Sequence, residues 1–405
     1  MLKTDEIEKL HIAVVGRQNV GKSKLINCIV NQELCIVNEY PGTTTDPISK
    51  EVELLPYGPV LIVDTAGIES EKDFEDKIIN KTLKTISNAD FAIVVLDARS
   101  ELTKSETKLI TLLRKIEVPF LVAVNKIEFG INQNLLTALS ALEVTHFEIS
   151  CKENAGIEYF KKKLIHLLPD KNKNQELKDI VCERDLVVFV VPDDYEMLNG
   201  RVIESYIKTI RELLPKQIKN IVIKESELQS RLKQLKKLPD LIITDSLSAE
   251  RIVPIISDSV KLTTYSLLVA KNRGTHSELI NCVKKVSDLQ NGDRVLILEA
   301  CDSHLQRFDL GKTKITSLLN ARLNKKLKFD FSNNSDFPQN ISDYKLIIHC
   351  DGCQLAGKLF LSKIRQAKLL DVPITSYSTL LAFVNNTLHR TYIPFNNSHT
   401  QTNNQ

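Results

Sequence analysis

A glycine-rich stretch near the amino terminus has the residues and the spacing to bind phosphate. Residues 16–23 read Gly-Arg-Gln-Asn-Val-Gly-Lys-Ser and follow a short apolar run. Gly16 and Gly21 permit a tight loop whose backbone N–H groups point at phosphate oxygens, and a helix that opens at Lys22 adds positive potential. We therefore predict a phosphate-binding loop in which Lys22 meets the β- and γ-phosphates and Ser23 meets Mg²⁺.

Two further segments follow in the order that a GTPase requires. Asp64 begins an Asp-Thr-Ala-Gly motif, in which Asp64 can hold a magnesium-bound water and the N–H of Gly67 can sense the γ-phosphate. Residues 41–46 read Pro-Gly-Thr-Thr-Thr-Asp and offer Thr44 as the switch threonine whose hydroxyl completes the magnesium shell. The predicted catalytic residues are Lys22, Thr44, Asp64 and Gly67.

A motif that reads the guanine base follows farther along the chain. Residues 125–128 match the guanine-reading pattern Asn-Lys-x-Asp except at the last position, where Glu128 stands. The extra methylene leaves open how this carboxylate would meet the N1 and N2 donors of guanine. Residues 150–152 fit the last loop on the guanine side. The predicted nucleotide ligands are Gly16, Asn19, Gly21, Lys22, Ser23, Asn125, Lys126, Glu128, Ser150, Cys151 and Lys152.

The means of hydrolysis differs from that of Ras-like GTPases, because Ile68 stands where they carry the glutamine that orients water. We therefore expect slow intrinsic turnover. Asn19 and the threonine-rich residues 42–46 resemble GTPases related to the tRNA-modifying enzyme MnmE, in which such an asparagine helps to hold K⁺ beside the phosphates. The resemblance implies that K⁺ activates hydrolysis more than Na⁺ does. The alternative is that Asn19 caps its own loop backbone.

Three cysteines near the carboxyl terminus could bind an inorganic centre. Cys350 and Cys353 have the two-residue gap that lets both thiolates meet one metal, and Cys301 follows an earlier apolar run. A third thiolate from a neighbouring strand end would make a three-cysteine iron–sulfur site. Zinc held with a histidine and a redox-active Cys-x-x-Cys pair are the two competing interpretations. His304 and His349 are candidates for a fourth ligand, or for structural histidines.

The remaining cysteines stand alone in apolar or helical surroundings. Such residues are more often small core residues than ligands. The five cysteines concerned are Cys28, Cys35, Cys151, Cys182 and Cys282.

The elements that position these motifs follow from the apolar pattern. Between residues 11 and 168, short apolar runs typical of buried parallel strands alternate with helical stretches, which predicts a doubly wound sheet. The polar residues 169–176 then predict a linker. The predicted strands of this part are 12–15, 60–63, 91–96, 120–124 and 146–149.

The rest of the chain repeats the α/β alternation without a glycine-rich loop. Its middle part predicts strands over residues 185–191, 220–224 and 241–244, with helices over 201–214 and 225–237. A further part opens near residue 263, and its apolar runs 295–298 and 345–349 each deliver a cysteine just past a strand end, where open α/β sheets place ligands.

Composition restricts the class of protein. The 405 residues suit two or three domains, and 42% apolar with 26% charged residues is the balance of an ordinary soluble protein. The formal net charge of only +3 gives no global attraction to nucleic acid or to a membrane surface. Neither a signal-type segment nor a run of ~20 apolar residues is present, so we expect a cytoplasmic protein without nucleic-acid or membrane partners.

Taken together, these motifs resemble the HydF family of FeFe-hydrogenase maturation GTPases. The resemblance includes residues 16–23 and 41–47, the phrases at 186–192 and 239–246, and the cysteine motifs Glu-Ala-Cys at 299–301 and His-Cys-Asp-Gly-Cys at 349–353. It implies three α/β domains: a P-loop GTPase with a doubly wound sheet, a small dimerisation domain, and a domain with a 4Fe–4S cluster on three cysteines. The corresponding boundaries are 1–170, 177–262 and 263–395, with a disordered tail over 396–405.

The resemblance also implies a role. Such a protein is a scaffold that accepts a diiron precursor built by the radical-SAM maturases HydE and HydG and delivers it to apo FeFe-hydrogenase. A cluster with three cysteine ligands keeps an exchangeable site on one iron. The family has a histidine two residues after the first cysteine, where this chain has Ser303. The candidates for the fourth ligand are therefore His304, His349, Glu299 and Asp302.

The resemblance further implies a homodimer or a higher oligomer, and a coupling in which GTP binding or hydrolysis changes the affinity for partners. The alternative function is that of a regulatory GTPase of the tRNA-modification or ribosome-assembly type, with a structural zinc or redox cysteine site. The cofactors expected for the first function are GTP, Mg²⁺, K⁺, the 4Fe–4S cluster and the transient diiron precursor.

Overall fold

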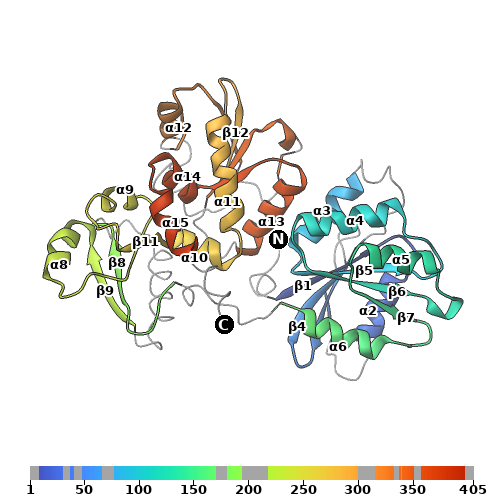
Figure 1. Cartoon of the computed structure of the whole chain (residues 1–405). Coiled ribbons are helices and arrows are strands. Elements are labelled where there is room, and N and C mark those ends of the chain that lie inside the picture. The colour runs from blue at the N-terminus through green and yellow to red at the C-terminus, as the bar shows by residue number, and fades with distance from the viewer. Residues whose placement is uncertain are drawn as a thin grey trace. The chain divides into compact units, whose positions relative to one another are not determined.

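The computed structural model describes most of the chain. The described residues are 9–30, 37–40, 48–65, 77–169, 180–193, 218–299, 313, 315–332, 337–338, 340–350 and 357–396. They belong to two compact units, Met1–Lys171 with Lys358–Leu369 and Asn172–Gly357 with Leu370–Gln405 (Figure 1). Among the described residues, no helix combines the length and the apolar character needed to cross a membrane.

The first unit contains a mixed seven-stranded sheet in the order β2-β3-β4-β1-β5-β6-β7. The strands from β4 to β7 run parallel, whereas β3 pairs antiparallel with both β2 and β4. All five strands predicted for this part are present, and β2 and β3 are additional. The bounds are β1 Leu10–Gly16, β2 Val37–Tyr40, β3 Ile48–Leu54, β4 Gly58–Asp64, β5 Phe91–Asp97, β6 Phe120–Asn125 and β7 His146–Ile149.

Helices cover both faces of this sheet (Figure 1), which explains why its strands are continuously apolar. Within β1, Ile12 and Val14 pack with helices α2 and α6, whereas Ala13 and Val15 pack with α3, α4 and α5 on the other face. The sheet thus separates two cores and holds the strand ends at one edge. The helices are α2 Lys22–Val30, α3 Lys77–Asn88, α4 Lys104–Lys115, α5 Gln133–Ala141, α6 Ile157–Leu167 and, from later in the chain, α13 Gly357–Leu369.

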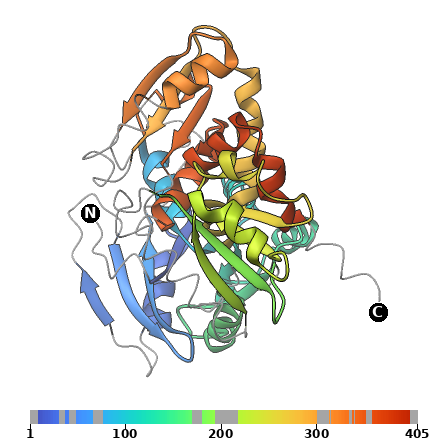
Figure 2. The same cartoon turned by 90° about the vertical axis from the view of Figure 1, so that its left-hand side faces the viewer.

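The second unit contains two four-stranded sheets, of which the first has the order β11-β10-β8-β9 and is parallel throughout. Helices α8 and α9 cover one face, and α10, α11 and α15 cover the other. Figure 2 shows β8 and β9 in green. The bounds are β8 Leu186–Val191, β9 Lys219–Lys224, β10 Leu241–Thr244, β11 Lys261–Thr264, α8 Leu228–Gln234, α9 Ala249–Ile252, α10 Tyr265–Asn272, α11 His276–Val283 and α15 Leu388–Asn396.

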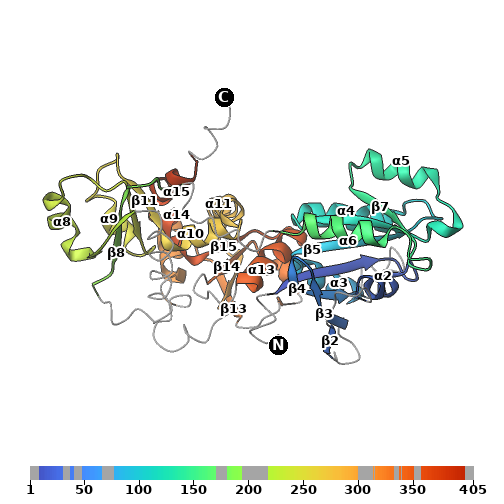
Figure 3. The same ribbon diagram turned by 90° about the horizontal axis from the view of Figure 1, so that it is seen from below.

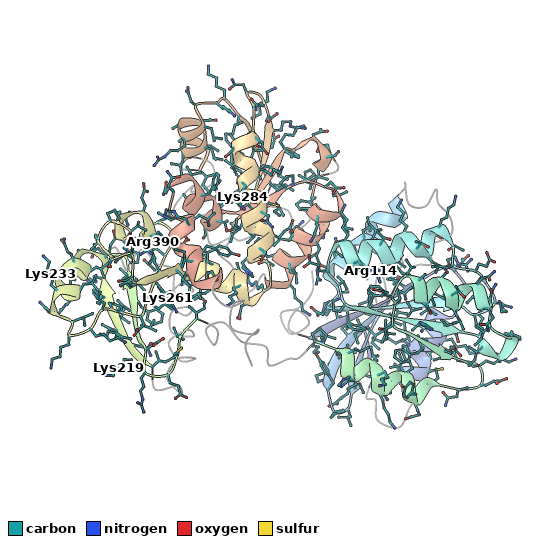
Figure 4. The ribbon with its side chains drawn as sticks, viewed as in Figure 1. Arg114, Lys219, Lys233, Lys261, Lys284 and Arg390 are labelled. Atoms are coloured by element: carbon teal, nitrogen blue, oxygen red, sulfur yellow. The ribbon has the colours of Figure 1, made fainter. Side chains whose placement is uncertain are left out.

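The carboxyl-terminal helix α15 is fastened to this sheet by one arginine. Arg390, labelled in Figure 4, donates to the carbonyl oxygens of Ser257, Asp258 and Val260 at 3.0–3.2 Å, directly before β11. Arg390 thus gives hydrogen bonds to three backbone carbonyls and ties the returning chain to the first of the two sheets.

The other sheet of the second unit has the order β13-β12-β14-β15 and is also parallel. Figure 3 shows β14 beside β15. Its core includes apolar residues from β12, β14, α12 and α14. The bounds are β12 Arg294–Leu298, β13 Lys328–Ser332, β14 Leu346–His349, β15 Ile374–Ser376, α12 Thr316–Leu323 and α14 Tyr377–Val384. Short 3-10 helices occupy Ile127–Phe129, Glu225–Glu227, Lys284–Asp288 and Ile341–Asp343.

The predicted elements of the second unit compare as follows. The three strands of its middle part are present, and the helix predicted over 225–237 appears as a 3-10 turn followed by α8, which ends at Gln234. The helix predicted over 201–214 lies outside the described residues, as does the predicted tail apart from Asn396. Strand β11 spans residues 262 and 263, where the sequence places a domain boundary, and it pairs with β10. The boundaries themselves stay a prediction.

Candidate functional site

The loop between β1 and α2 requires glycine at two positions. Gly16 has φ +151° and Gly21 has φ +104°, values that L side chains rarely adopt. A Cβ atom on Gly16 would collide with the carbonyl oxygen of Val95, and a Cβ atom on Gly21 would collide with the amide nitrogen of Asn125. The two glycines therefore let the loop lie against β5 and the end of β6.

The magnesium candidates of the loop and of β4 meet each other. Ser23 Oγ donates to Asp64 Oδ2 at 2.5 Å, and Asp64 Oδ1 is buried without a hydrogen-bond partner among the described residues. Thr65, next along the chain, is tied to β1 by its hydroxyl, which donates to the carbonyl oxygen of Val14 at 2.8 Å. A hydroxyl beside a carboxylate with a spare oxygen fits the hard, oxygen-preferring Mg²⁺ ion.

Lys22 lies folded over the loop that it would serve. Its Nζ donates to the carbonyl oxygens of Gly16 at 3.2 Å and Arg17 at 2.9 Å. Burial lowers the pKa of Lys22, and the charge of Asp64 acts in the opposite sense. The ammonium group is thus held at the centre of the phosphate loop.

Asn125 joins the phosphate loop to the guanine-side loop. Its amide nitrogen donates to the carbonyl oxygen of Val20 at 2.9 Å, and its amide oxygen accepts from the backbone N–H of Cys151 at 3.0 Å. The side chain is only 2% exposed. Both functions of the amide are used to hold two loops that are distant in sequence.

Lys126 also connects strand ends. Its Nζ donates to the carbonyl oxygen of Asn19 at 2.6 Å and to Asp97 Oδ2 at 2.8 Å. Arg99 binds the same carboxylate through two nitrogens at 3.0 and 2.8 Å. These contacts, led by the Arg99 hydrogen bond, hold the pKa of Asp97 well below its usual range although burial opposes them. The sequence prediction missed Asp97, although an acidic residue at a parallel strand end was the available signal.

Glu128 and Ser150 meet on the guanine side. A hydrogen bond from Ser150 is the main cause that lowers the pKa of Glu128. One oxygen of this carboxylate, Oε2, is buried without a hydrogen-bond partner among the described residues. An ionised carboxylate with a spare acceptor suits the donors of a guanine edge, in spite of the extra methylene.

An aromatic side chain that the sequence prediction did not name stands beside this site. The Phe129 ring is 57% exposed. Arg99 Cζ lies 5.4 Å and Lys152 Nζ lies 5.1 Å from the ring centroid. Each cation is within the range of a cation–π interaction, so the ring orders two basic side chains of the guanine-side loops.

Two of the remaining cysteines contact each other. Cys28 Sγ of α2 donates to the carbonyl oxygen of Cys151 at 3.5 Å, and burial raises the pKa of the Cys151 thiol to about 12. The core prediction is right for Cys151 and wrong for Cys182, which is exposed. Cys182 lies in a surface turn, where its N–H donates to Asp185 Oδ2 at 2.7 Å. Cys282 is half-buried.

Several predicted site residues lie outside the described part of the chain. They are Thr44, Gly67, Cys301, Asp302, His304 and Cys353, together with Cys35.

The cysteine region is organised by β12 and β14. These neighbouring parallel strands place Leu298 opposite His349 at their carboxyl ends. The N–H of Cys350 donates to the carbonyl oxygen of Leu298 at 3.0 Å, and Cys350 is 3% exposed within the apolar core. Cys301 follows Leu298 by three residues. The two chain segments that carry the three cysteines thus follow neighbouring strand ends at the same edge of one sheet.

Two of the fourth-ligand candidates are described and buried. Glu299 Oε1 accepts a hydrogen bond from the Tyr377 hydroxyl at 3.2 Å, and the tyrosine comes from α14. His349 Nδ1 lies 2.6 Å from the carbonyl oxygen of Cys350. No group of three or more metal-binding side chains gathers within the described residues, which include one of the three cysteines. The donor set predicted from the sequence, three thiols with a histidine or a carboxylate as the fourth ligand, fits an iron–sulfur cluster chemically.

Relatives of known name match the first part of the chain. The tRNA modification GTPase MnmE of Finegoldia magna is 32% identical over 186 residues, which are 44% of this chain and 39% of that protein. GTPase Der of Clostridium novyi is 36% identical over 129 residues, 31% of this chain and 29% of that protein. The match thus spans less than half of each relative. The G domain of the T. maritima FeoB iron transporter aligns with a TM-score of 0.29 at 23% identity, over 39% of this chain and 98% of that one.

Family models match all three parts. Residues 11–126 match a model described as 50S ribosome-binding GTPase, so the nucleotide site lies in a GTPase domain, which implies GTP and Mg²⁺. Residues 177–274 match the hydrogen maturase F dimerization domain, and residues 277–394 match its tetramerization domain. These two models together match more than half of the chain, which therefore carries domains for self-association. The chain belongs to the hydrogen maturase F family and is a GTPase of that type.

Proposed function

We propose that the protein carries a 4Fe–4S cluster on Cys301, Cys350 and Cys353 and delivers a diiron precursor to apo FeFe-hydrogenase, under the control of GTP hydrolysis in its first unit. The observation that carries the proposal is the pairing of Leu298 with His349, because it sends two cysteine-bearing segments out of one sheet edge. The membership of the hydrogen maturase F family supports the same role.

The residues of the nucleotide site divide the work of hydrolysis. Lys22 would neutralise charge on the β- and γ-phosphates. Ser23 and Asp64, which lie in hydrogen-bond contact, would hold Mg²⁺, and the ion would supply Lewis acidity. Asn125 and Lys126 keep the base loop and the phosphate loop in register. Catalysis then depends on positioning and on fixed positive charge more than on a basic side chain.

Potassium is the proposed additional charge. Asn19 has φ +60°, and its side chain is exposed at the phosphate loop, so its amide oxygen is free to face a cation beside the nucleotide. The measurement is the rate of GTP hydrolysis in KCl against NaCl at equal ionic strength, for wild type and Asn19→Ala. We expect faster hydrolysis in KCl for wild type only. Equal rates in the two salts would remove K⁺ from the account.

The cysteine site is proposed to keep one iron open to exchange. Three thiolates supply three of the four positions, and the fourth belongs to one of Glu299, Asp302, His304 or His349. Among these, Glu299 is already oriented by Tyr377. A weakly held fourth ligand is what a transient anchor for a diiron fragment requires.

The partners follow from this role. We propose that HydE and HydG supply the diiron fragment, with its carbon monoxide and cyanide ligands, and that apo FeFe-hydrogenase receives it. Nucleotide binding changes the affinity for these partners and need not drive the metal chemistry. Hydrogenase binding that is equal for the nucleotide-free, GTP and GDP forms would exclude this coupling.

The direct experiment is activation of apo-hydrogenase by the anaerobically purified full chain, loaded by HydE and HydG. Wild type and Cys182→Ser are expected to activate the hydrogenase, since Cys182 is an exposed cysteine in the turn before β8 and outside the proposed cluster ligands. Cys353→Ser is expected to give no more than background hydrogen evolution. Activation by Cys353→Ser at the wild-type level would overturn the proposed delivery, and a colourless zinc protein would favour a regulatory GTPase with a structural metal.

A further inference from the structure

Helix α13 belongs by its contacts to the GTPase unit, although it stands late in the chain. Its residues Lys358–Leu369 cluster with Met1–Lys171, while the residues on either side belong to the other unit. The helix also lies within the 277–394 match to the hydrogen maturase F tetramerization domain. By sequence, α13 therefore belongs to the carboxyl-terminal domain, and by its contacts it belongs to the nucleotide-binding unit.

The central contact of α13 is made by a buried arginine. Arg365 Nη1 donates to the carbonyl oxygen of Ala89 at 2.6 Å and to that of Ser87 at 3.2 Å. Arg365 is 8% exposed, and burial lowers the pKa of its guanidinium while the charge of Asp90 opposes this. The carbonyls at the end of an α-helix lack partners within the helix and carry negative potential. Arg365 thus holds the carboxyl end of α3.

Two lysines of α13 add further contacts with the GTPase unit. Lys358 Nζ forms an ion pair with Asp90 Oδ2 at 2.7 Å and also contacts the carbonyl oxygen of Lys9. The same Asp90 oxygen accepts from the N–H of His11 in β1 at 2.8 Å. Lys368 pairs with Glu117 at 2.7 Å, between α4 and β6. The amino end of β1, the end of α3 and the start of β6 are therefore linked to one helix.

Helices α3 and α13 each follow a segment that contains predicted functional residues. At its amino end, α3 begins at Lys77, twelve residues after Thr65, and the motif that a GTPase uses to sense the γ-phosphate begins at Asp64. Before α13, only seven residues separate Lys358 from Cys350, and Cys353 lies among them. A rigid helix passes a displacement from one end to the other, and the eight residue steps from Cys350 to Lys358 span at most ~29 Å.

We propose that Arg365 is a positioning residue that links α3 to α13, so that the nucleotide state is transmitted along α13 to the segment bearing Cys350 and Cys353. The part of this inference that concerns the iron–sulfur cluster rests on the proposed function. The part that concerns the nucleotide rests only on the contacts of α13 with the GTPase domain. Nucleotide hydrolysis and cysteine chemistry are then connected by one helix within a single chain.

The test is hydrogen exchange on the full chain, in the presence of GDP or of a non-hydrolysable GTP analogue, in peptides that cover α3 and residues 346–357. In wild type we expect exchange in both regions to differ by about threefold or more between the two nucleotides. In Arg365→Ala the difference over 346–357 is expected to disappear, with GDP affinity within about twofold of wild type. Arg365→Lys should restore part of it, and Leu359→Ala, at an exposed position of the same helix, should keep it.

A second variant separates coupling from folding. Insertion of Gly-Ser-Gly-Ser between Gln354 and Leu355 lengthens the chain without touching the contacts of α13. It is expected to keep the nucleotide-dependent exchange in α3 and to lose it over 346–357. A nucleotide response over 346–357 that persists in both Arg365→Ala and the insertion variant would overturn the inference, and so would its absence from wild type. Iron content of the same samples tests the proposed cluster independently.

Discussion

The GTPase sheet and the β13-β12-β14-β15 sheet both end their parallel strands at a candidate site, but they fasten those ends differently. In the GTPase sheet, side chains cross between strand ends, as Asn125 and Lys126 do. In the other sheet, the described contacts between strand ends are mainly backbone hydrogen bonds, such as that from Cys350 to Leu298. The nucleotide site is therefore ordered by its own side chains, whereas the described edge of the cysteine-bearing sheet is ordered mainly by strand pairing.

The largest expected effect is a loss of GTP hydrolysis without a loss of iron. Lys22→Ala removes the charge at the centre of the phosphate loop, and we expect GTP hydrolysis to fall by about 100-fold or more. Iron and sulfide content should not change, because Lys22 belongs to the first compact unit and β12 and β14 belong to the second. Hydrolysis and metal analysis of the anaerobic protein measure both. Lys162→Ala, an exposed lysine of α6, is the control, and joint loss of iron with hydrolysis in Lys22→Ala would break the separation.

Removing the Asn125 side chain, which connects two loops of the GTPase sheet, should weaken nucleotide binding and leave the cysteine site unchanged. Asn125→Ala leaves the N–H of Cys151 and the carbonyl of Val20 without their partner, at about 1–3 kcal/mol for each buried group. We expect nucleotide affinity to fall by roughly 30-fold or more, measured with a fluorescent GDP analogue. Asn134→Ala, on the exposed face of α5, should bind as wild type does. Unchanged affinity in Asn125→Ala would show that the loops are held by other contacts.

The role of Glu128 in guanine recognition can be tested by replacing its carboxylate, a hydrogen-bond acceptor, with an amide that can also donate. Glu128→Gln replaces an ionised acceptor by an amide that can donate to the O2 carbonyl of xanthine. We expect the ratio of GTP to XTP affinity to drop by about tenfold, from competition binding. The same ratio in wild type and Glu128→Gln would mean that Glu128 does not touch the base.

The smallest effect is one of stability and depends on pH. The contacts of Arg99 and Lys126 hold the pKa of Asp97 below its ordinary value of about 4, so their stabilisation is complete above that pH and is lost as the pH falls through the lower folded value. Asp97→Asn should lower the Tm by about 3–6 °C at pH 7, and by less below pH 4. Asp288→Asn, at an exposed ion pair, serves as control. A difference that grows toward low pH would contradict this assignment.

The features that could be predicted from the sequence are those that a short local pattern of residues determines. Gly16, Gly21 and Lys22 are recognisable because the loop needs their backbone freedom and charge within eight residues, and buried strands are readable as apolar runs. Strand β3 was missed because charged residues alternate with apolar ones beside a sheet edge. The contact between Cys28 and Cys151 and the grip of Arg365 on Ala89 join residues far apart in the chain, so no local pattern could have shown them.

The central claim is that three cysteines from two strand ends hold one iron–sulfur cluster. It is tested most directly by iron and sulfide analysis with paramagnetic resonance of the reduced, anaerobically purified chain, for wild type, Cys301→Ser and Cys182→Ser. We predict about four irons and four sulfides per chain with a cluster signal in wild type and Cys182→Ser, and loss of the native signal in Cys301→Ser. Wild-type protein without iron or without a cluster signal, or a Cys301→Ser variant with the wild-type spectrum, would contradict it.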